Sequence, residues 1–202
     1  MTKRIVVLIS GSGTNLQALI DAERQGKLGG KIALVVSNKK SAYGLTRATE
    51  AGIPIFTQTL KAYKDAGKSR EDFDRDLASH IALTQNPDLV VLAGWMHILS
   101  PAFIDTFSGK IINLHPALPG ELDGAHAIER AYNEFVAGTR TRTGVMVHYV
   151  IPEVDKGKPI LVQEVACAEG DSLEDLENRI HAVEHEILPK AARLVLSGQP
   201  GY

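Results

Sequence analysis

Short apolar runs alternate with amphipathic segments along most of the chain. Residues 4–10 form a continuous β-branched and leucine run, which is typical of a strand buried on both faces. Similar runs predict strands at residues 32–36, 53–56, 88–93 and 110–114. Because strands that alternate with helices need right-handed crossovers, this part of the chain indicates a parallel sheet.

The segments between these strands favour helices. Thr14 or Asn15 can cap the first helix through a side-chain oxygen. Further helices are predicted at residues 43–51, 101–107, 125–136 and 172 to about 197. A helix that opens at residues 69–72 has a predicted inner stripe of Phe73, Leu77, Ile81 and Leu83. Residues 59–68 are polar and aperiodic and predict a loop.

The last two strands differ from the others. Residues 145–150 and 159–165 are joined by a turn-rich segment, so they are expected to pair antiparallel. The predicted fold class is therefore α/β: a Rossmann-like, mainly parallel sheet flanked by helices, with a C-terminal antiparallel strand pair. No repeat or linker divides the chain, which predicts a single domain over residues 1–202.

Composition narrows the class of protein. The chain is 44% hydrophobic and 23% charged with a formal net charge of -2, which gives no global reason to expect a nucleic-acid or membrane partner. The apolar run at residues 5–9 is too short for a signal peptide or a spanning helix. The lone Cys167 forms no internal disulfide. A soluble, cytoplasmic protein is expected.

A glycine loop joins the first strand to the first helix. It consists of Gly11, Ser12, Gly13, Thr14 and Asn15. Glycines let the backbone approach an anion, and the free N–H groups of a helix N-terminus point toward it, so a phosphate fits here. A tight turn before a capped helix, with no ligand, is the alternative interpretation.

Two nucleotide motifs can be set aside. Leu16 stands where the dinucleotide fingerprint needs its third glycine. Asn38 lies near the position where that fingerprint has an acidic residue, so a nicotinamide cofactor is disfavoured. Residues 67–69 resemble the end of a phosphate-binding P-loop. However, Ala62 replaces the required first glycine, and no strand precedes it.

Most of the histidines have a structural interpretation. His80 is expected at the surface or half-buried, and His148 as a packed, hydrogen-bonded core residue. His181 and His185 match an inverted zinc-protease pattern, but no third ligand follows Glu186. No metal site is therefore predicted.

His115 is the exception, because it follows a buried strand where the sheet opens. Asn113 and His115 are two residues apart and point to the same side of an extended segment, where an amide and an imidazole can hold an oxyanion. Pro116 restricts His115 to extended conformations. Asp155 lies in the later turn, and a carboxylate close to an imidazole raises its pKa.

Four segments in order, residues 6–17, 92–96, 113–118 and 154–157, resemble the phosphoribosylglycinamide formyltransferases. The resemblance implies transfer of a formyl group from 10-formyltetrahydrofolate to the amine of glycinamide ribonucleotide in de novo purine biosynthesis, without a metal. Asn-x-His-Pro with a later Asp is shared by formyltransferases that use this folate. Residues 118–121 and 146–150 look like the monofunctional fungal form.

The resemblance also implies roles for individual residues. Asn113 and His115 would hold the formyl oxygen, with His115 as general acid and Asp155 keeping it protonated. The backbone of the glycine loop would hold the substrate phosphate, and Glu184 the ribose hydroxyls. The residues that would line the reduced-folate site are Arg70, Met96, His97, Ile98, Leu99 and Asn113, together with residues 151–155.

This chain departs from the family pattern at three places. His97 stands where many relatives carry Arg, and Met146 where many have a small hydroxyl residue. The loop after Pro116 is shorter than in bacterial relatives.

Two alternatives stay open. One is another folate-dependent formyltransferase or hydrolase, although 202 residues leave no room for the extra domain that such enzymes normally carry. The other is a non-catalytic nucleotide-binding module, which leaves Asn113, His115 and Asp155 without a joint purpose. The oligomeric state, monomer or homodimer, is not encoded in any recognisable pattern.

Overall fold

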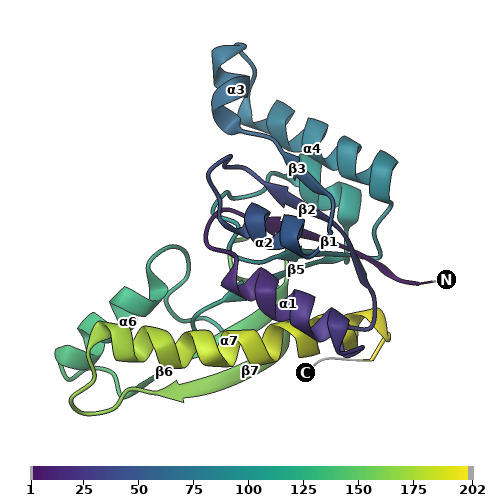
Figure 1. The fold of residues 1–202 in the computed structure, drawn as a ribbon. Helices are drawn as coiled ribbons and strands as arrows, with labels where there is room; N and C mark the ends of the chain where they lie inside the picture. The colour runs from purple at the N-terminus through teal and green to yellow at the C-terminus, as the bar shows by residue number, and fades with distance from the viewer. Residues whose placement is uncertain (1, 200–202) are drawn as a thin grey trace.

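The computed structural model describes residues 2–199, in which seven strands form one sheet in the order β3-β2-β1-β4-β5-β6-β7 (Figure 1). Pairing is parallel from β3 through β5 and antiparallel for β6 and β7, which confirms the predicted fold class. The strands are β1 (Arg4–Ile9), β2 (Lys31–Ser37), β3 (Ile55–Thr57), β4 (Leu89–Leu92), β5 (Ile111–His115), β6 (Arg142–Tyr149) and β7 (Pro159–Ala166).

Helices cover both faces of the sheet. In Figure 1, α1 and α7 lie side by side on one face, while α4 covers the other. Alternate residues of β1 enter the two cores: Ile5, Val7 and Ile9 pack toward α1 and α7, and Val6 and Leu8 toward α4. The helices are α1 (Thr14–Arg24), α2 (Gly44–Glu50), α3 (Leu60–Asp65), α4 (Arg70–Gln85), α5 (Pro101–Ile104), the short η1 (Asp105–Phe107), α6 (Ala127–Val136) and α7 (Leu173–Leu196).

Helix starts follow the sequence signals at α4 and α7. Ser69 and Ser172 each accept a backbone N–H three residues ahead, and Asp72 and Asp175 return the bond as capping boxes. Within residues 2–199, no helix combines the length and apolar composition needed to cross a membrane.

Two local predictions are wrong in this part of the fold. The predicted loop at residues 59–68 contains α3, whose six residues include only Leu60 and Tyr63 as packing residues, too few to show a helical period. Leu83, assigned to the inner stripe of α4, is 87% exposed. It follows Ile81 by two residues, which is about 200° around a helix, so the two point in opposite directions.

At the carboxyl ends of β1 and β4 the chain crosses to opposite faces of the sheet, to α1 after β1 and to α5 after β4. Ser10 follows β1, and its N–H donates to the Gly94 carbonyl at 3.0 Å. Its hydroxyl oxygen accepts the Met96 N–H at 2.8 Å. Ligand sites of doubly wound sheets lie at such a crevice. Ser10 thus ties the glycine loop to the loop at residues 94–99.

Candidate active site

The end of β5 presents two polar side chains to one face of the sheet. β5 runs through His115, so Asn113 and His115 alternate onto the same side, as predicted. On β6, His148 lies opposite Asn113 and Met146 lies opposite His115. Directly opposed antiparallel residues share a face. Met146 therefore puts an apolar, buried side chain beside His115, where no side-chain hydroxyl is available to the ring.

The turn after β6 brings Asp155 to these residues. One carboxylate oxygen lies 3.4 Å from His115 Nδ1 and accepts the Gly124 N–H at 2.9 Å. The other accepts from Asn113 Nδ2 at 3.4 Å and lies 3.5 Å from His148 Nε2. The predicted proximity of Asp155 to His115 is confirmed.

Gly157 allows this turn to pass close to β6. A Cβ at residue 157 would lie 1.6 Å from the Tyr149 carbonyl oxygen and 3.3 Å from His148 Nδ1. No side chain fits at these distances. The glycine two residues after Asp155 therefore sets how near the carboxylate comes to the end of β5.

His148 belongs to this cluster although sequence analysis gave it a purely structural role. It is buried and its Nδ1 lies 2.8 Å from the Tyr149 carbonyl oxygen, as expected of a satisfied core histidine. With Nδ1 donating there, Nε2 of a neutral ring can accept from Asn113 Nδ2, 3.4 Å away. His148 thus helps to orient the Asn113 amide.

The predicted upward shift of the His115 pKa is wrong for the ligand-free protein. Burial of the ring lowers the pKa of His115, and Asp155 offsets only part of this effect. For Asp155, burial tends to raise the pKa, but the contact with His148 and the hydrogen bond from the Gly124 N–H lower it by more, so the net pKa is below its ordinary value. The pair therefore consists of an ionised carboxylate beside an imidazole that favours its neutral form.

The second nitrogen of His115 also faces an acceptor. Nε2 lies 3.2 Å from the carbonyl oxygen of Leu122, whose φ of 50° places it in the left-handed region. A neutral ring protonated at Nε2 donates this bond. The structure thus shows His115 directing an N–H toward a carbonyl oxygen, a contact that no sequence pattern announced.

The glycine loop begins α1 without a side-chain cap. The N-cap residue is Gly13, at φ 73°, so the predicted capping by Thr14 or Asn15 is wrong. The first intrahelical bond joins the Gln17 N–H to the Gly13 carbonyl at 2.9 Å. The N–H groups of Thr14, Asn15 and Leu16 therefore lack acceptors in the preceding turn and are available to an anion.

Asn15 instead points toward α7. Its Nδ2 donates to the Glu184 carboxylate at 3.0 Å, while its Oδ1 is buried without a hydrogen-bond partner. Glu184 is 5% exposed, and this burial raises the pKa of its carboxyl group, against the lowering effects of Asn15 and His181. Asn15 Oδ1 is an unused acceptor beside Glu184, which suits a ligand carrying hydroxyl groups.

Gly13→Ala should impair phosphate binding more than a loop substitution elsewhere. A Cβ at residue 13 would lie 2.6 Å from the Gly44 Cα, and the positive φ disfavours any side chain. We expect the KM for a phosphorylated substrate to rise about tenfold or more, and the KM for the folate that the family resemblance implies to change less than about twofold.

The matched control for this substitution is Gly26→Ala. Gly26 also has a positive φ, but nothing lies within 4 Å of its Cβ position. Both variants share the backbone strain, and only the residue 13 variant disturbs the loop. Steady-state kinetics with each substrate varied in turn compares them, and equal effects on both KM values would contradict the assignment.

A cavity of about 480 Å³ opens at the end of β5. Its lining brings the polar cluster of Asn113, His115 and Asp155 together with apolar side chains of the 94–99 loop and of residues 150–154. Met96 and Ile98 are 78% and 59% exposed at this loop. An apolar lining with a few converging polar groups is typical of a site for a small organic ligand.

Arg70, the first residue of α4, reaches the same loop from outside the cavity. Its guanidinium donates to the Ile98 carbonyl oxygen. The structure therefore places Arg70 at the rim beside the loop, consistent with the predicted position near an extended ligand tail.

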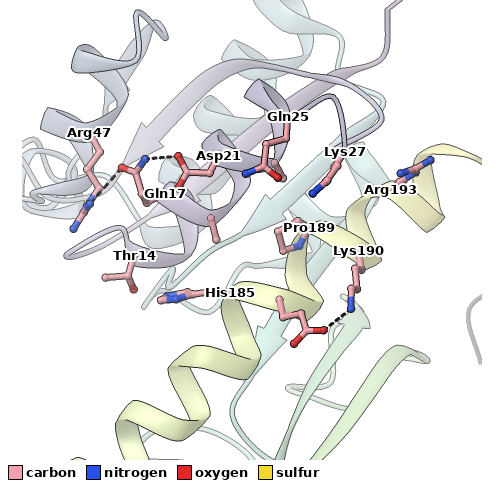
Figure 2. A pocket seen from close by; sticks show the side chains of 13 residues that line it. Thr14, Gln17, Asp21, Gln25, Lys27, Arg47, His185, Pro189, Lys190 and Arg193 are labelled. Carbon is pink, nitrogen blue, oxygen red and sulfur yellow. Dashed lines mark hydrogen bonds and ion pairs between the residues drawn. The ribbon is translucent and has the colours of Figure 1, made fainter.

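A larger cavity, of about 770 Å³, lies between α1 and α7 and begins at Thr14 (Figure 2). Figure 2 shows Arg47, bonded to Gln17, near the Thr14 end, and Lys27 and Arg193 at the far end. The cavity contains none of the three polar residues gathered at the end of β5. Its volume therefore does not make it the reacting site, although its basic side chains favour anions near the glycine loop.

Comparison with known proteins gives a consistent result. A family model described as Formyl transferase matches residues 3–192. The phosphoribosylglycinamide formyltransferase of Schizosaccharomyces pombe is 53% identical, covering 98% of this chain and 99% of the relative. That of Saccharomyces cerevisiae is 46% identical, covering 96% and 97%. The chain belongs to the formyl transferase family.

The fold of this formyl transferase is also shared with solved structures. Glycinamide ribonucleotide transformylase 1 from Symbiobacterium toebii matches with a TM-score of 0.90 at 41% identity, covering 98% of this chain and 89% of that chain. The resemblance to phosphoribosylglycinamide formyltransferases, including fungal ones, is confirmed.

The two histidines of the zinc-like pattern lie on the α7 side of this formyl transferase. His181 is exposed, and His185 is partly buried with Nε2 unpartnered. Within residues 2–199, no group of three or more His, Cys, Asp or Glu side chains is arranged to hold a metal ion. Glu184, between them in sequence, points to Asn15 instead.

Proposed function

We propose that this formyl transferase moves the formyl group of 10-formyltetrahydrofolate to the amine of 5-phosphoribosylglycinamide, giving formylglycinamide ribonucleotide and tetrahydrofolate. The convergence of Asn113, His115 and Asp155 in the lining of the 480 Å³ cavity carries the proposal. The names of the relatives support phosphoribosylglycinamide as the formyl acceptor. A nucleotide-binding module would not need these three groups together.

The glycine loop is proposed to hold the substrate phosphate. The free N–H groups at the start of α1 donate to it, and Glu184 with Asn15 receives the ribose hydroxyls. Ser10 joins this loop to the loop that lines the folate cavity. The substrate amine and the formyl donor can therefore meet at the end of β5.

The donor cavity suits a reduced folate. Met96, Ile98 and Val154 supply apolar surface for flat rings, and Arg70 at the rim supplies a cation for the glutamate tail. The polar groups of β5 then face the formyl carbon.

The proposed chemistry needs two donors and one proton acceptor. The amine nitrogen bonds to the formyl carbon, the carbonyl electron pair moves to oxygen, and the bond to the folate nitrogen then breaks. Asn113 Nδ2 and a His115 N–H hold the oxygen. Asp155 accepts the amine proton through one water and passes it to His115 Nδ1, and His115 gives a proton to the departing folate nitrogen, so the net protonation of the pair is restored.

The protonation of His115 is proposed to change during the reaction. Burial favours the neutral ring in the ligand-free protein. A negative oxygen at one ring nitrogen and Asp155 at the other both favour the imidazolium form, so proton affinity rises as the oxyanion develops.

The direct test is incubation with glycinamide ribonucleotide and 10-formyltetrahydrofolate while tetrahydrofolate release is followed. We expect turnover that requires both compounds. Release without the ribonucleotide would indicate a hydrolase, and no turnover by folded protein would favour the binding-module alternative.

We also propose that the chain acts in the cytoplasm as a single domain, monomer or homodimer, on small molecules rather than nucleic acid or membranes. The balanced charge and the lone Cys167, packed partly buried against the core, support this setting. Burial raises the pKa of the Cys167 thiol, which disfavours reactivity. Light scattering of the purified protein tests the oligomeric state.

A further inference from the structure

The loop from Trp95 to Leu99 borders the cavity with side chains that alternate between buried and exposed. Trp95 and Leu99 are buried in the core beneath α4, whereas Met96 and Ile98 are exposed. His97 follows the inward set, since its side chain is 6% exposed. The two residues with the most exposed apolar surface therefore sit between three whose side chains are anchored inside.

His97 is the polar anchor of this set. Its Nε2 lies 2.9 Å from the Asp74 carboxylate, whose side chain is 0% exposed. The other oxygen of Asp74 accepts the Ser100 N–H at 2.7 Å. Among residues 2–199, His97 is the one basic side chain within ion-pair distance of Asp74.

Aromatic neighbours hold the imidazole ring in place. The ring centroid of Phe73 lies 5.2 Å from that of His97, and the Trp95 ring packs edge-on at 6.1 Å. A buried carboxylate requires hydrogen-bond donors, because without them the free-energy cost of removing it from water is not compensated. The contact between α4 and the loop is therefore specific in direction as well as apolar.

We propose that His97 is a positioning residue, which through Asp74 fixes the 94–100 loop so that Met96 and Ile98 face the folate. The inference rests on the proposed function for the identity of the ligand. His97 borders the cavity, as the family resemblance implies, but its side chain is 6% exposed and already paired with Asp74 of α4. Its effect on folate affinity therefore passes through the loop rather than by direct contact.

A set of variants tests this inference. His97→Leu removes the donor, and His97→Gln keeps an amide N–H that can reach Asp74. We expect His97→Leu to raise the KM for 10-formyltetrahydrofolate about tenfold, with kcat and the KM for the ribonucleotide within about twofold. His97→Gln should restore the folate KM to within about threefold of wild type.

Asp74→Ala separates positioning from direct contact, since Asp74 does not line the cavity. It should raise the folate KM as His97→Leu does, and the double variant should be no worse than either single variant. His80→Leu is the matched control, because His80 also lies on the α4 side of the sheet but stacks on Phe56, with centroids 3.9 Å apart. It should leave the folate KM unchanged.

Trp95 gives a readout independent of turnover. It is the chain's single tryptophan, so its fluorescence reports on this loop alone. In the ligand-free protein, His97→Leu and Asp74→Ala should shift the emission to longer wavelength, whereas His97→Gln and His80→Leu should not. Thermal unfolding confirms that each variant is folded.

The outcomes distinguish the two proposals. Failure of wild-type formyl transfer would overturn the proposed function, but the emission pattern would still test the anchor. A His97→Gln variant as impaired as His97→Leu, additive effects in the double variant, or unchanged Trp95 emission would each overturn the positioning role.

Discussion

Asp155→Asn is expected to lower kcat by ~10²–10⁴, the usual range for lost acid–base assistance. The φ of residue 155 is 55°, a region that Asn tolerates better than most residues, so the turn should survive. The amide oxygen can still accept the Gly124 N–H. The substitution therefore removes the charge and leaves the local geometry.

The same substitution has a defined effect on His115. Burial lowers the pKa of His115, and the Asp155 carboxylate partly offsets this. Removing the negative charge removes the offset, so the pKa of His115 should fall further below its ordinary value. NMR titration of the ring protons in the ligand-free protein measures the direction directly.

Asp123→Asn serves as the comparison for Asp155→Asn. Asp123 lies on the neighbouring loop and pairs with Lys156, and it raises the pKa of His115 less than Asp155 does. We expect its kcat to stay within about threefold of wild type. A residue 155 variant that turns over normally, with His115 titrating as before, would make Asp155 a turn residue.

Asn113→Leu is expected to lower kcat by ~10²–10³, the usual effect of losing one oxyanion donor. Leucine keeps a similar volume and removes both N–H groups of Nδ2. Those groups lie 3.4 Å from both Asp155 and His148, which are long contacts. The Asn113 amide therefore loses only weak hydrogen bonds when it turns toward a substrate oxygen. Its contribution is expected to appear mainly in kcat.

The comparison variant is Asn133→Leu on the exposed surface of α6. It removes the same group from a residue outside the cavity and should leave kcat unchanged. If Asn113→Leu instead raised only the folate KM and kept kcat, Asn113 would bind the ground state without stabilising the oxyanion.

The sequence predicted those features that depend on local pattern. Continuous apolar runs located the parallel strands, and the spacing of Asn113 and His115 placed both on one face. Capping at α1 was not predictable, because Thr14 and Asn15 satisfy the same composition rule whether or not their oxygens reach the backbone. Their actual partners depend on the approach of α2 and α7.

Features that depend on tertiary distance were not predictable. His148 enters the site only through the antiparallel register of β5 and β6. The spacing of the two predicted strands indicated that they pair, but a register shift of one residue would have placed His148 on the opposite face of the sheet. The pKa of His115 depends on how much apolar surface encloses the ring, which no single neighbour in sequence reveals.

The bond from His115 to the Leu122 carbonyl has a consequence for how binding energy is used. A formyl oxygen that takes the place of that carbonyl exchanges one neutral acceptor for another, so the ground state gains little affinity from it. A negatively charged oxygen is a much stronger acceptor. In the ligand-free enzyme, the Leu122 carbonyl thus competes with the substrate oxygen for the His115 N–H, and only the charged oxygen of the transition state binds this N–H more strongly. The contribution of His115 is therefore expected in kcat rather than in KM.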